Sequence, residues 1–232
     1  MRSAALLTLI LLLGPPASVV APQRVTFRTD DGITLTGTWY EASSRPAPAV
    51  VLVHMFQRSR RDWDSFAARL ASEGIGALAF DLRGHGESQG AIGQDLARMV
   101  SDVRAARRFA ADRAEVRPGK IGVAGASLGA NLAALEAADD AGVASVALLS
   151  PSLDYRGLRI EAAVRKYGAR PLLLVASDDD PYASRSVRDL EKAGGRGHEP
   201  LILSHAGHGT MMLLESPGLA DSLVDWFRRT LQ

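Results

Sequence analysis

The stretch K-I-G-V-A-G-A-S-L-G-A-N-L-A-A-L-E-A-A-D, residues 120–139, decides the fold. Its first part, Lys120–Gly125, predicts a buried strand, and Leu128–Asp139 predicts a helix. Between them lies the pattern G-x-S-x-G, with Ser127 at its centre. A serine on so sharp a strand-to-helix turn projects out of the sheet, and small residues on both sides permit the tight backbone. We therefore expect Ser127 to be a nucleophile.

Strands and helices are expected to alternate on both sides of this stretch. The expected strands are Arg24–Thr29, Ile33–Tyr40, Ala49–Met55, Ile75–Asp81, Lys120–Gly125, Val143–Leu149, Pro171–Ala176 and Pro200–Ser204. The expected helices are Asp62–Glu73, Gln94–Arg113, Leu128–Asp139, Leu158–Tyr167, Tyr182–Ala193 and Leu219–Leu231. The first two strands flank a turn and form an antiparallel hairpin. The rest predicts one α/β domain with a mostly parallel central sheet and helices on both faces.

Length and composition narrow the function classes. The 232 residues suit one domain of ordinary size, and the chain contains no cysteine. Zinc ribbons, iron–sulfur clusters and thiol nucleophiles are therefore excluded. Lys and Arg number 27 against 26 Asp and Glu, so the charge balance gives no reason to expect a nucleic acid or an anionic membrane as partner.

The first 21 residues differ from the rest of the chain. Arg2 precedes the apolar run Ala4–Leu13, which as a helix spans only about 15 Å, half of a bilayer core of about 30 Å. A basic start, a short apolar middle and small residues up to Ala21 predict a secretory signal. We expect residues 1–21 to be this signal, residues 22–232 to be the mature domain, and the protein to be periplasmic or secreted. A proline directly after the cleavage site favours the alternative, an uncleaved membrane anchor.

Two further loops follow predicted strands. Ser177-Asp178-Asp179-Asp180-Pro181 follows one strand, and a carboxylate at a strand end can orient an imidazole and stabilise its charged form. At least two of the three aspartates must instead belong to a solvated acidic turn that opens the next helix. After the last strand, His205-Ala206-Gly207-His208-Gly209 supplies two candidate bases.

An oxyanion hole is expected where the first central strand ends, at Leu52–Phe56. There the backbone N–H of Phe56 is placed to act together with the N–H of Leu128, the first residue after the candidate nucleophile. Backbone donors of this kind stabilise the negative charge that develops on an attacked carbonyl.

These features resemble the α/β-hydrolase superfamily over nearly all of residues 24–232. The order Ser127…Asp180…His208 is the order of that family's catalytic triad, and Phe80–Ser88 is similar to its D-x-R-G-H-G-x-S segment. The resemblance implies that Asp180, before a proline, is the acid, with Asp179 as the alternative. It implies that the glycine-flanked His208, rather than His205, is the base. It also implies structural roles for Asp81, Arg83, His85 and His54.

Within the superfamily the chain is most similar to the small dienelactone hydrolase-like enzymes that lack a lid. Only about twenty residues, Ser150–Arg170, lie where larger members insert one. Ser127 stands where dienelactone hydrolases carry Cys and where dehalogenases and epoxide hydrolases carry Asp. Met55 stands where the family has Gly, so we expect a reshaped acyl pocket.

The resulting prediction is a serine hydrolase that cleaves carboxylic esters of small molecules through an acyl-enzyme on Ser127, without metal or organic cofactor. A serine peptidase, an acyltransferase or a non-catalytic binding protein on the same fold are the alternatives. Arg58, Arg60 and Arg61 predict a solvated surface, or else a site that steers acidic substrates or contacts membrane phosphates. Asp154–Gly157 is a further candidate for lining the cleft. The oligomeric state does not follow from the sequence.

Overall fold

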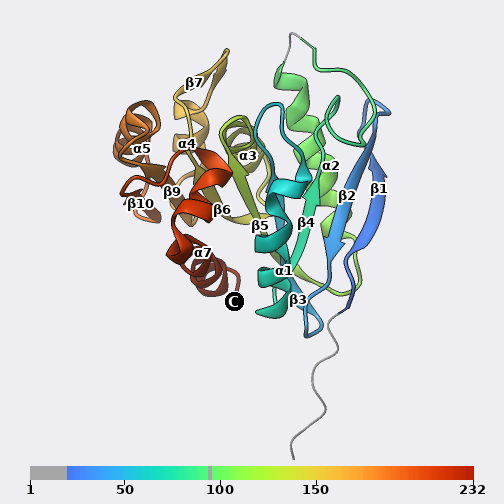
Figure 1. Ribbon diagram of the computed structural model, residues 1–232. Helices are drawn as coiled ribbons and strands as arrows, with labels where there is room; N and C mark the ends of the chain where they lie inside the picture. Colours follow the sequence, from blue (N-terminus) through green and yellow to red (C-terminus); the bar gives the residue numbers. More distant parts are fainter. Residues whose placement is uncertain (1–19, 94–95) are drawn as a thin grey trace, which may run out of the picture.

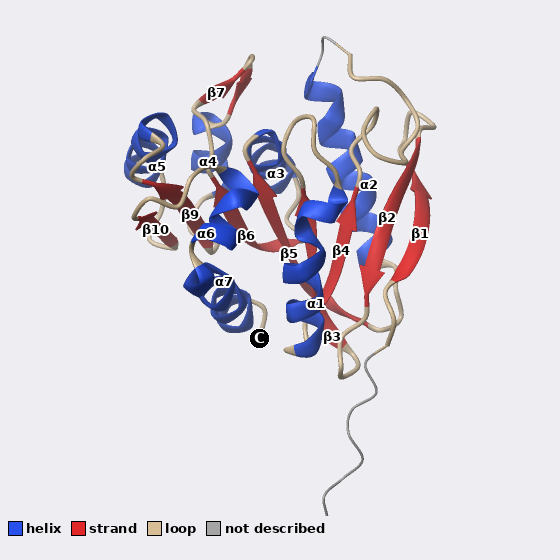
Figure 2. Cartoon of the chain, in the orientation of Figure 1, coloured by secondary structure: helices blue, strands red, loops and turns tan. Residues whose placement is uncertain are grey.

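A computed structural model describes residues 20–93 and 96–232 of the chain (Figures 1 and 2). Residues 1–19 of the expected signal, and Gln94, the expected start of the second helix, lie outside the described residues. The strands are β1 Gln23–Arg28, β2 Thr34–Tyr40, β3 Ala47–Val53, β4 Gly76–Phe80, β5 Val116–Ala126, β6 Val143–Leu149, β7 Asp154–Tyr155, β8 Leu158–Arg159, β9 Leu172–Ser177 and β10 His198–Leu203. The α-helices are α1 Asp64–Ser72, α2 Val100–Ala111, α3 Leu128–Asp139, α4 Glu161–Tyr167, α5 Pro181–Ala193, α6 Met212–Glu215 and α7 Pro217–Thr230. Short 3-10 helices are η1 Arg60–Trp63, η2 Leu96–Met99 and η3 Gly209–Met211.

The central sheet has eight strands in the order β1-β2-β4-β3-β5-β6-β9-β10. β1 and β2 form the antiparallel hairpin, and β2 joins β4 antiparallel. The pairs from β4 through β3, β5, β6 and β9 to β10 are all parallel. The predicted mostly parallel sheet with an N-terminal hairpin is therefore confirmed.

Helices cover both faces of the sheet, as predicted (Figure 2). One face, here called the α3 face, is covered by α2, α3, α4 and α5; the other, the α7 face, by α1, α6 and α7. The strand β3 shows why both faces are apolar. Its Val51 and Val53 pack into the α3-face core, while Val50 and Leu52 pack into the α7-face core. A strand with a core on each side needs apolar residues at every position, because successive side chains alternate between faces.

Two predicted helices differ in the structure. The helix expected over Gln94–Arg113 is regular only from Val100, after the 3-10 turn η2. The helix expected from Leu158 begins at Glu161, because Leu158 and Arg159 form β8 and pair with β7. The carbonyl of Leu158 accepts a hydrogen bond from Asn131 of α3 at 2.8 Å, so this residue is held in the strand.

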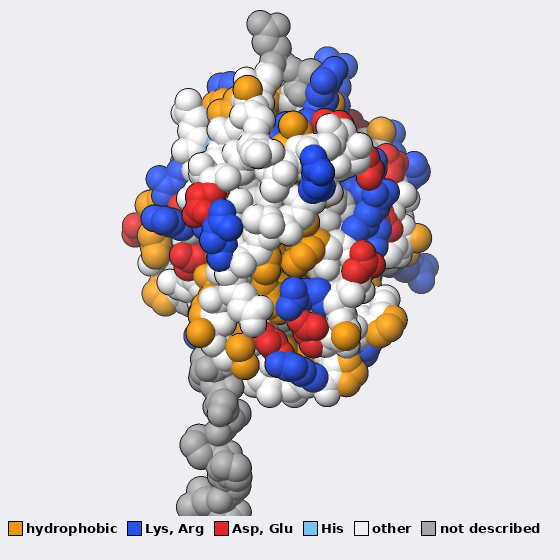
Figure 3. Space-filling model, turned by 90° about the vertical axis from the view of Figure 1, so that its right-hand side faces the viewer, with side chains coloured by type: hydrophobic (Ala, Val, Ile, Leu, Met, Phe, Trp, Pro, Cys, Tyr) orange, Lys and Arg blue, Asp and Glu red, His pale blue; other side chains and the backbone are white. Residues whose placement is uncertain are grey.

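The two edge strands of the central sheet differ in the features that hinder pairing with a strand of another chain. β1 carries exposed Arg24 and Arg28, and on this side of the molecule cationic and acidic side chains are interspersed (Figure 3). β10, at the opposite edge, contains Pro200, which has no backbone N–H. None of the helices in the described ranges has both the length and the apolar character that crossing a bilayer requires.

Candidate active site

Ser127 lies on the turn between β5 and α3 with a left-handed backbone, φ 51° and ψ −117°. Non-glycine residues seldom adopt positive φ, so this turn is strained. Its N–H donates to the Leu149 carbonyl at 2.9 Å, which ties the turn to the end of β6. The side chain is thereby held at the carboxyl end of the sheet, where the sequence places a nucleophile.

The two glycines of the pattern are required by close backbone approaches. A Cβ built on Gly125 would overlap the Gly129 carbonyl oxygen and lie 2.7 Å from the Ala130 nitrogen. A Cβ on Gly129 would overlap the Val53 carbonyl and lie 2.7 Å from the His54 oxygen. Without these side chains the first turn of α3 packs directly on β5 and on the end of β3.

His208 and Asp180 form a hydrogen-bonded pair. Nδ1 of His208 lies 2.5 Å from Oδ2 of Asp180, and the other carboxylate oxygen caps α5 by accepting the Ala183 N–H at 3.2 Å. Since the carboxylate accepts the Nδ1 proton, Nε2 of the neutral imidazole is left as a proton acceptor. The His208 side chain is half exposed, as a base in an open site needs to be.

The other two aspartates hold the loop that carries His208. Asp178 accepts the His205 N–H at 2.7 Å and the Ser204 hydroxyl at 3.1 Å. Asp179 accepts the Gly207 N–H at 3.1 Å. Both side chains are exposed in a turn directly before α5, as expected, and each in addition bonds the facing loop. The bond from the His205 N–H lowers the pKa of Asp178, and the bond from the Ser177 hydroxyl lowers the pKa of Asp179.

The histidine loop also lies against the residues around Ser127. The Gly209 N–H donates to the Ser150 hydroxyl at 2.9 Å, directly after β6. A Cβ on Gly209 would overlap the Met55 sulfur and lie 3.6 Å from the Ala126 Cβ. Met55 thus contacts the histidine loop and packs toward the α7 face. His205, the alternative base, has a side chain 83% exposed and interacts with Ser204 and Asp178.

The two expected oxyanion donors are the backbone N–H groups of Phe56 and Leu128. Among the residues that the structure describes, nothing accepts the N–H of Phe56 or the N–H of Leu128. Leu128 is the first residue of α3, where backbone N–H groups are free and the helix dipole favours negative charge. A carbonyl oxygen that becomes negative beside Ser127 is the ligand that suits such donors.

Two buried histidines hold the loop that contains Phe56. Nε2 of His85 accepts the Gln57 N–H at 3.2 Å, and Nδ1 donates to the Arg83 carbonyl. His54 accepts the Leu82 N–H at 3.0 Å through Nε2 and donates to the Met55 carbonyl through Nδ1. Burial lowers the pKa of His54 to about 4, so it is neutral and its ring can serve as both donor and acceptor.

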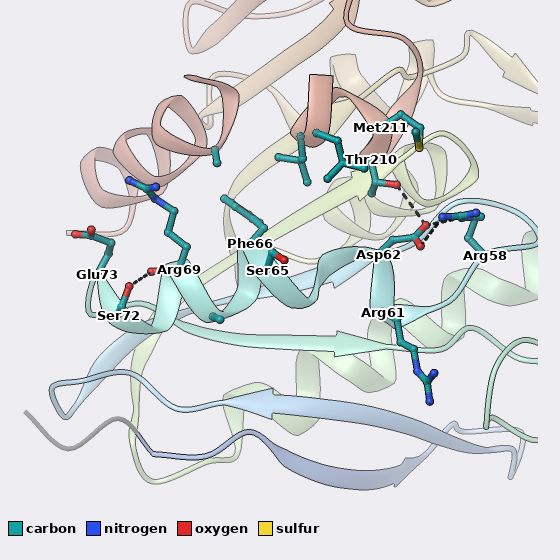
Figure 4. Close-up of a pocket in the computed structure, with 14 residues that line it drawn as sticks. Arg58, Arg61, Asp62, Ser65, Phe66, Arg69, Ser72, Glu73, Thr210 and Met211 are labelled. Atoms are coloured by element: carbon teal, nitrogen blue, oxygen red, sulfur yellow. Dashed lines mark hydrogen bonds and ion pairs between the residues drawn. The ribbon is translucent and has the colours of Figure 1, made fainter. Parts of the chain in front are cut away.

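Arg58, Arg60 and Arg61 were expected to form a solvated surface, and Arg60 does not belong to it. It is buried and pairs with Asp81 and with Glu87, in the segment after β4. Arg58 pairs with Asp62 at 2.8 Å, while the Arg61 side chain points away from Asp62 and Arg58 (Figure 4).

A groove of about 870 Å³ lies between α1 and the η3–α6 segment (Figure 4). Thr210 and Met211 line it directly after the histidine loop, whereas Ser127 is not part of its wall. Phe66, Leu213 and Leu214 make much of the wall apolar. The groove therefore lies on the α7 face, next to the segment that follows His208.

No group of three or more His, Asp or Glu side chains in the described part of the chain is arranged to hold a metal ion. The carboxylates near Ser127 are instead bound to N–H and O–H donors, as the preceding contacts show.

Comparison with known proteins decides the family. Residues 44–185, well over half of the chain, match the profile of the family described as Serine aminopeptidase, S33. The chain belongs to the S33 family of α/β-hydrolases. Among relatives of this S33 hydrolase is the uncharacterized protein Rv2307c of Mycobacterium tuberculosis (strain ATCC 25618 / H37Rv). The two are 28% identical over 238 residues, which are 93% of this chain and 83% of the relative.

Solved structures share the fold of this S33 hydrolase. The Pyrococcus furiosus esterase Pf2001 superposes with a TM-score of 0.75 at 18% identity, covering 94% of this chain and 100% of the esterase. A dienelactone hydrolase from Anabaena variabilis gives 0.74 at 20% identity, covering 91% and 99%. The predicted α/β-hydrolase fold and the resemblance to small dienelactone hydrolase-like proteins are therefore confirmed.

Sequence reasoning missed several residues of this S33 hydrolase that shape the site. Asp178 and Asp179 bond the histidine loop, and Ser150 bonds Gly209. The signal for the aspartates was present as three consecutive carboxylates after one strand, which need N–H or O–H donors. Nothing in the sequence points to Ser150, because its role depends on the neighbouring strand order.

Proposed function

We propose that this hydrolase cleaves carboxylic esters through an acyl-enzyme on Ser127. The observation that carries the proposal is the pairing of His208 with Asp180 at 2.5 Å, beside a strained serine turn and two N–H groups for which the described residues supply no acceptor. A nucleophile, an oriented base and oxyanion donors are the components that acyl transfer requires.

In the proposed mechanism His208 Nε2 accepts the Ser127 proton while Oγ attacks the ester carbonyl. The N–H groups of Phe56 and Leu128 stabilise the resulting oxyanion, and Asp180 stabilises the imidazolium. His208 then returns the proton to the leaving alcohol, and the acyl group stays on Ser127. In the second half a water molecule, deprotonated by His208, attacks the acyl-enzyme and releases the acid.

The charges around the site support an ester over an aminopeptide. A peptide N-terminus is cationic and needs a carboxylate to bind it, yet Asp178, Asp179 and Asp180 are occupied by the histidine loop. The exposed, cationic side chain of Arg156 lies over the Phe56 ring, 4.8 Å from its centroid, and would repel a cationic N-terminus bound there. The structural similarity to an enzyme named as an esterase agrees with this choice.

The test is hydrolysis of p-nitrophenyl esters of increasing acyl length, comparing the wild type with Ser127→Ala. Loss of the serine should lower kcat/KM by about 10⁴- to 10⁶-fold. A fluorophosphonate should label Ser127 in the wild type, as read by peptide mass spectrometry. Circular dichroism of both proteins establishes that the variant is folded.

Other outcomes identify the alternatives. A labelled Ser127 without ester turnover would indicate an amide substrate or an acyl acceptor other than water. Neither label nor turnover would contradict the catalytic role and favour a binding protein on this fold.

For localisation, the proposal is export directed by residues 1–21, with cleavage after Ala21. N-terminal sequencing of protein recovered from the periplasm or medium should then begin at Pro22. Recovery of the intact N-terminus in the membrane fraction would support the uncleaved anchor.

A further inference from the structure

The turn of the β7–β8 hairpin places a cation on the side chain of Phe56, the residue that carries one of the expected oxyanion donors. The Arg156 guanidinium lies over the Phe56 ring, 4.8 Å from its centroid, and 5.8 Å from the centroid of the Tyr155 ring. No described carboxylate lies within ion-pair distance of it, whereas Arg159 on the same hairpin pairs with Asp154 at 2.9 Å. An arginine with free donors at the rim of a site is suited to bind a carboxylate.

The hairpin that carries Arg156 is firmly attached to the fold. The side chain of buried Asn131, on α3, donates to the carbonyls of Ser152 and Leu158 at 2.8 Å, and accepts the Ser152 N–H at 3.0 Å. Both ends of the hairpin are thus fixed to the helix that begins directly after Ser127. In Figure 1 the hairpin extends beyond the top of the sheet.

Arg156 occupies a position that disfavours arginine. The two turn residues, Arg156 and Gly157, have φ of 48° and 92°. Two-residue hairpin turns with positive φ at both positions favour Asn or Asp followed by Gly. An arginine here is therefore unfavourable for the turn itself, which indicates that its side chain serves another purpose.

The position of Arg156 relative to His208 indicates which part of an ester it contacts. Phe56 and Tyr155 pack against the α3-face core, while Ala206 of the histidine loop belongs to the α7-face core and Met55 packs against it. In the proposed mechanism His208 protonates the leaving oxygen, so the alcohol portion lies on its side. The acyl portion is then directed toward the hairpin.

We propose that Arg156 binds a carboxylate at the far end of the acyl chain, so that the preferred substrates are monoesters of dicarboxylic acids. This inference rests on the proposed ester hydrolysis. It requires an acyl chain long enough to keep the carboxylate away from the oxyanion, because two negative charges close together repel.

The test compares monomethyl adipate with methyl hexanoate, which release the same alcohol and differ by a carboxylate in place of a terminal methyl group. Arg156→Asn removes the charge and places a residue that favours this turn. It should lower kcat/KM for the acidic ester by about 10- to 100-fold and that for methyl hexanoate by less than about threefold. The matched control, Arg159→Asn, should leave both values unchanged, and Arg156→Lys should retain part of the preference.

A binding measurement separates this inference from the proposed function. The Ser127→Ala protein should bind monomethyl adipate about tenfold or more tightly than the double variant Ser127→Ala, Arg156→Asn. Titration calorimetry measures this difference in affinity whether or not the wild type hydrolyses esters. Equal binding and equal kinetics with and without the Arg156 side chain would overturn its role. A loss confined to esters that carry the carboxylate on the alcohol would overturn the assignment to the acyl side.

Discussion

At the level of single residues, the acid loop divides three adjacent aspartates among three tasks. Asp180 bonds the imidazole of His208, Asp179 bonds the backbone one residue earlier, and Asp178 bonds the backbone at His205. Each of the three aspartates thereby forms a hydrogen bond with a different residue of the histidine loop. The geometry of the pair depends on both loops together, and the two loops are close only because β9 and β10 are neighbours.

Asp180→Asn should isolate the contribution of this pair to the proposed reaction. The amide can donate to Nδ1, which favours the imidazole tautomer whose Nε2 carries the proton and cannot accept another. Esterase kcat should fall by about 10³- to 10⁴-fold with little change in thermal stability. The control is Asp189→Asn on the exposed side of α5, with unchanged kcat. A small effect at Asp180 would mean that another residue orients His208.

His54 should make stability depend on pH. Its pKa falls from 6.5 to about 4 on burial, so between these values the unfolded state binds the proton and the folded state does not. Lowering the pH through this window should therefore remove about 3 kcal/mol of stability, since one pKa unit corresponds to about 1.4 kcal/mol. Above the window the contribution is constant.

Urea unfolding of the wild type and of His54→Gln across this pH range measures the effect. The difference between the two profiles isolates His54 from other groups, including His198, whose pKa burial also lowers. If the free energies of unfolding of the two proteins change in parallel with pH, His54 does not titrate in this way.

At the level of elements, the packing of α3 on β3 depends on the absence of one side chain. Gly129→Ala would place a methyl group against the Val53 and His54 carbonyls. We expect the free energy of unfolding to fall by about 3 kcal/mol and ester hydrolysis to fall with it, because the helix carries the Leu128 N–H. Gly218→Ala in α7, where an added Cβ meets no atom within 4 Å, should change neither value. Calorimetric melting measures the stability of the two variants, and initial rates measure their ester hydrolysis.

The elements also show what the sequence could predict. The strands β3, β4 and β6 and the second half of β5 follow from continuous apolar runs, because burial on both faces leaves no other pattern. The start of β5, Val116–Gly119, is largely exposed and was not predicted. The hairpin β7–β8 was not predictable, since Arg156 is unusual in such a turn and Leu158 is held by Asn131 from α3. In the site, Ser127 and His208 stand in local patterns, while the partners of Asp178 and Asp179 arise only from contacts between distant loops.

At the level of the whole molecule, the His208 side of the site is open to solvent, and Ser127 lies buried behind it. The segment between β6 and β9 holds the short hairpin and α4 in place of a helical lid, and the His208 side chain is half exposed. Hydrolysis of tributyrin should therefore rise smoothly with concentration and show no jump at its solubility limit, because no element must move before the substrate enters. A jump in rate at that limit would show that a part of the molecule closes over the site.

The sheet edges have a consequence for behaviour at high protein concentration. Exposed strand edges are templates on which a second chain can add, and this is a common route to aggregates. Exposed Arg28 places a charged side chain on β1, and Pro200 leaves β10 without one of the backbone N–H groups that an added strand would bond. Concentrated solutions of the folded protein should stay clear, and replacing Pro200 with valine should be the change that first makes them turbid.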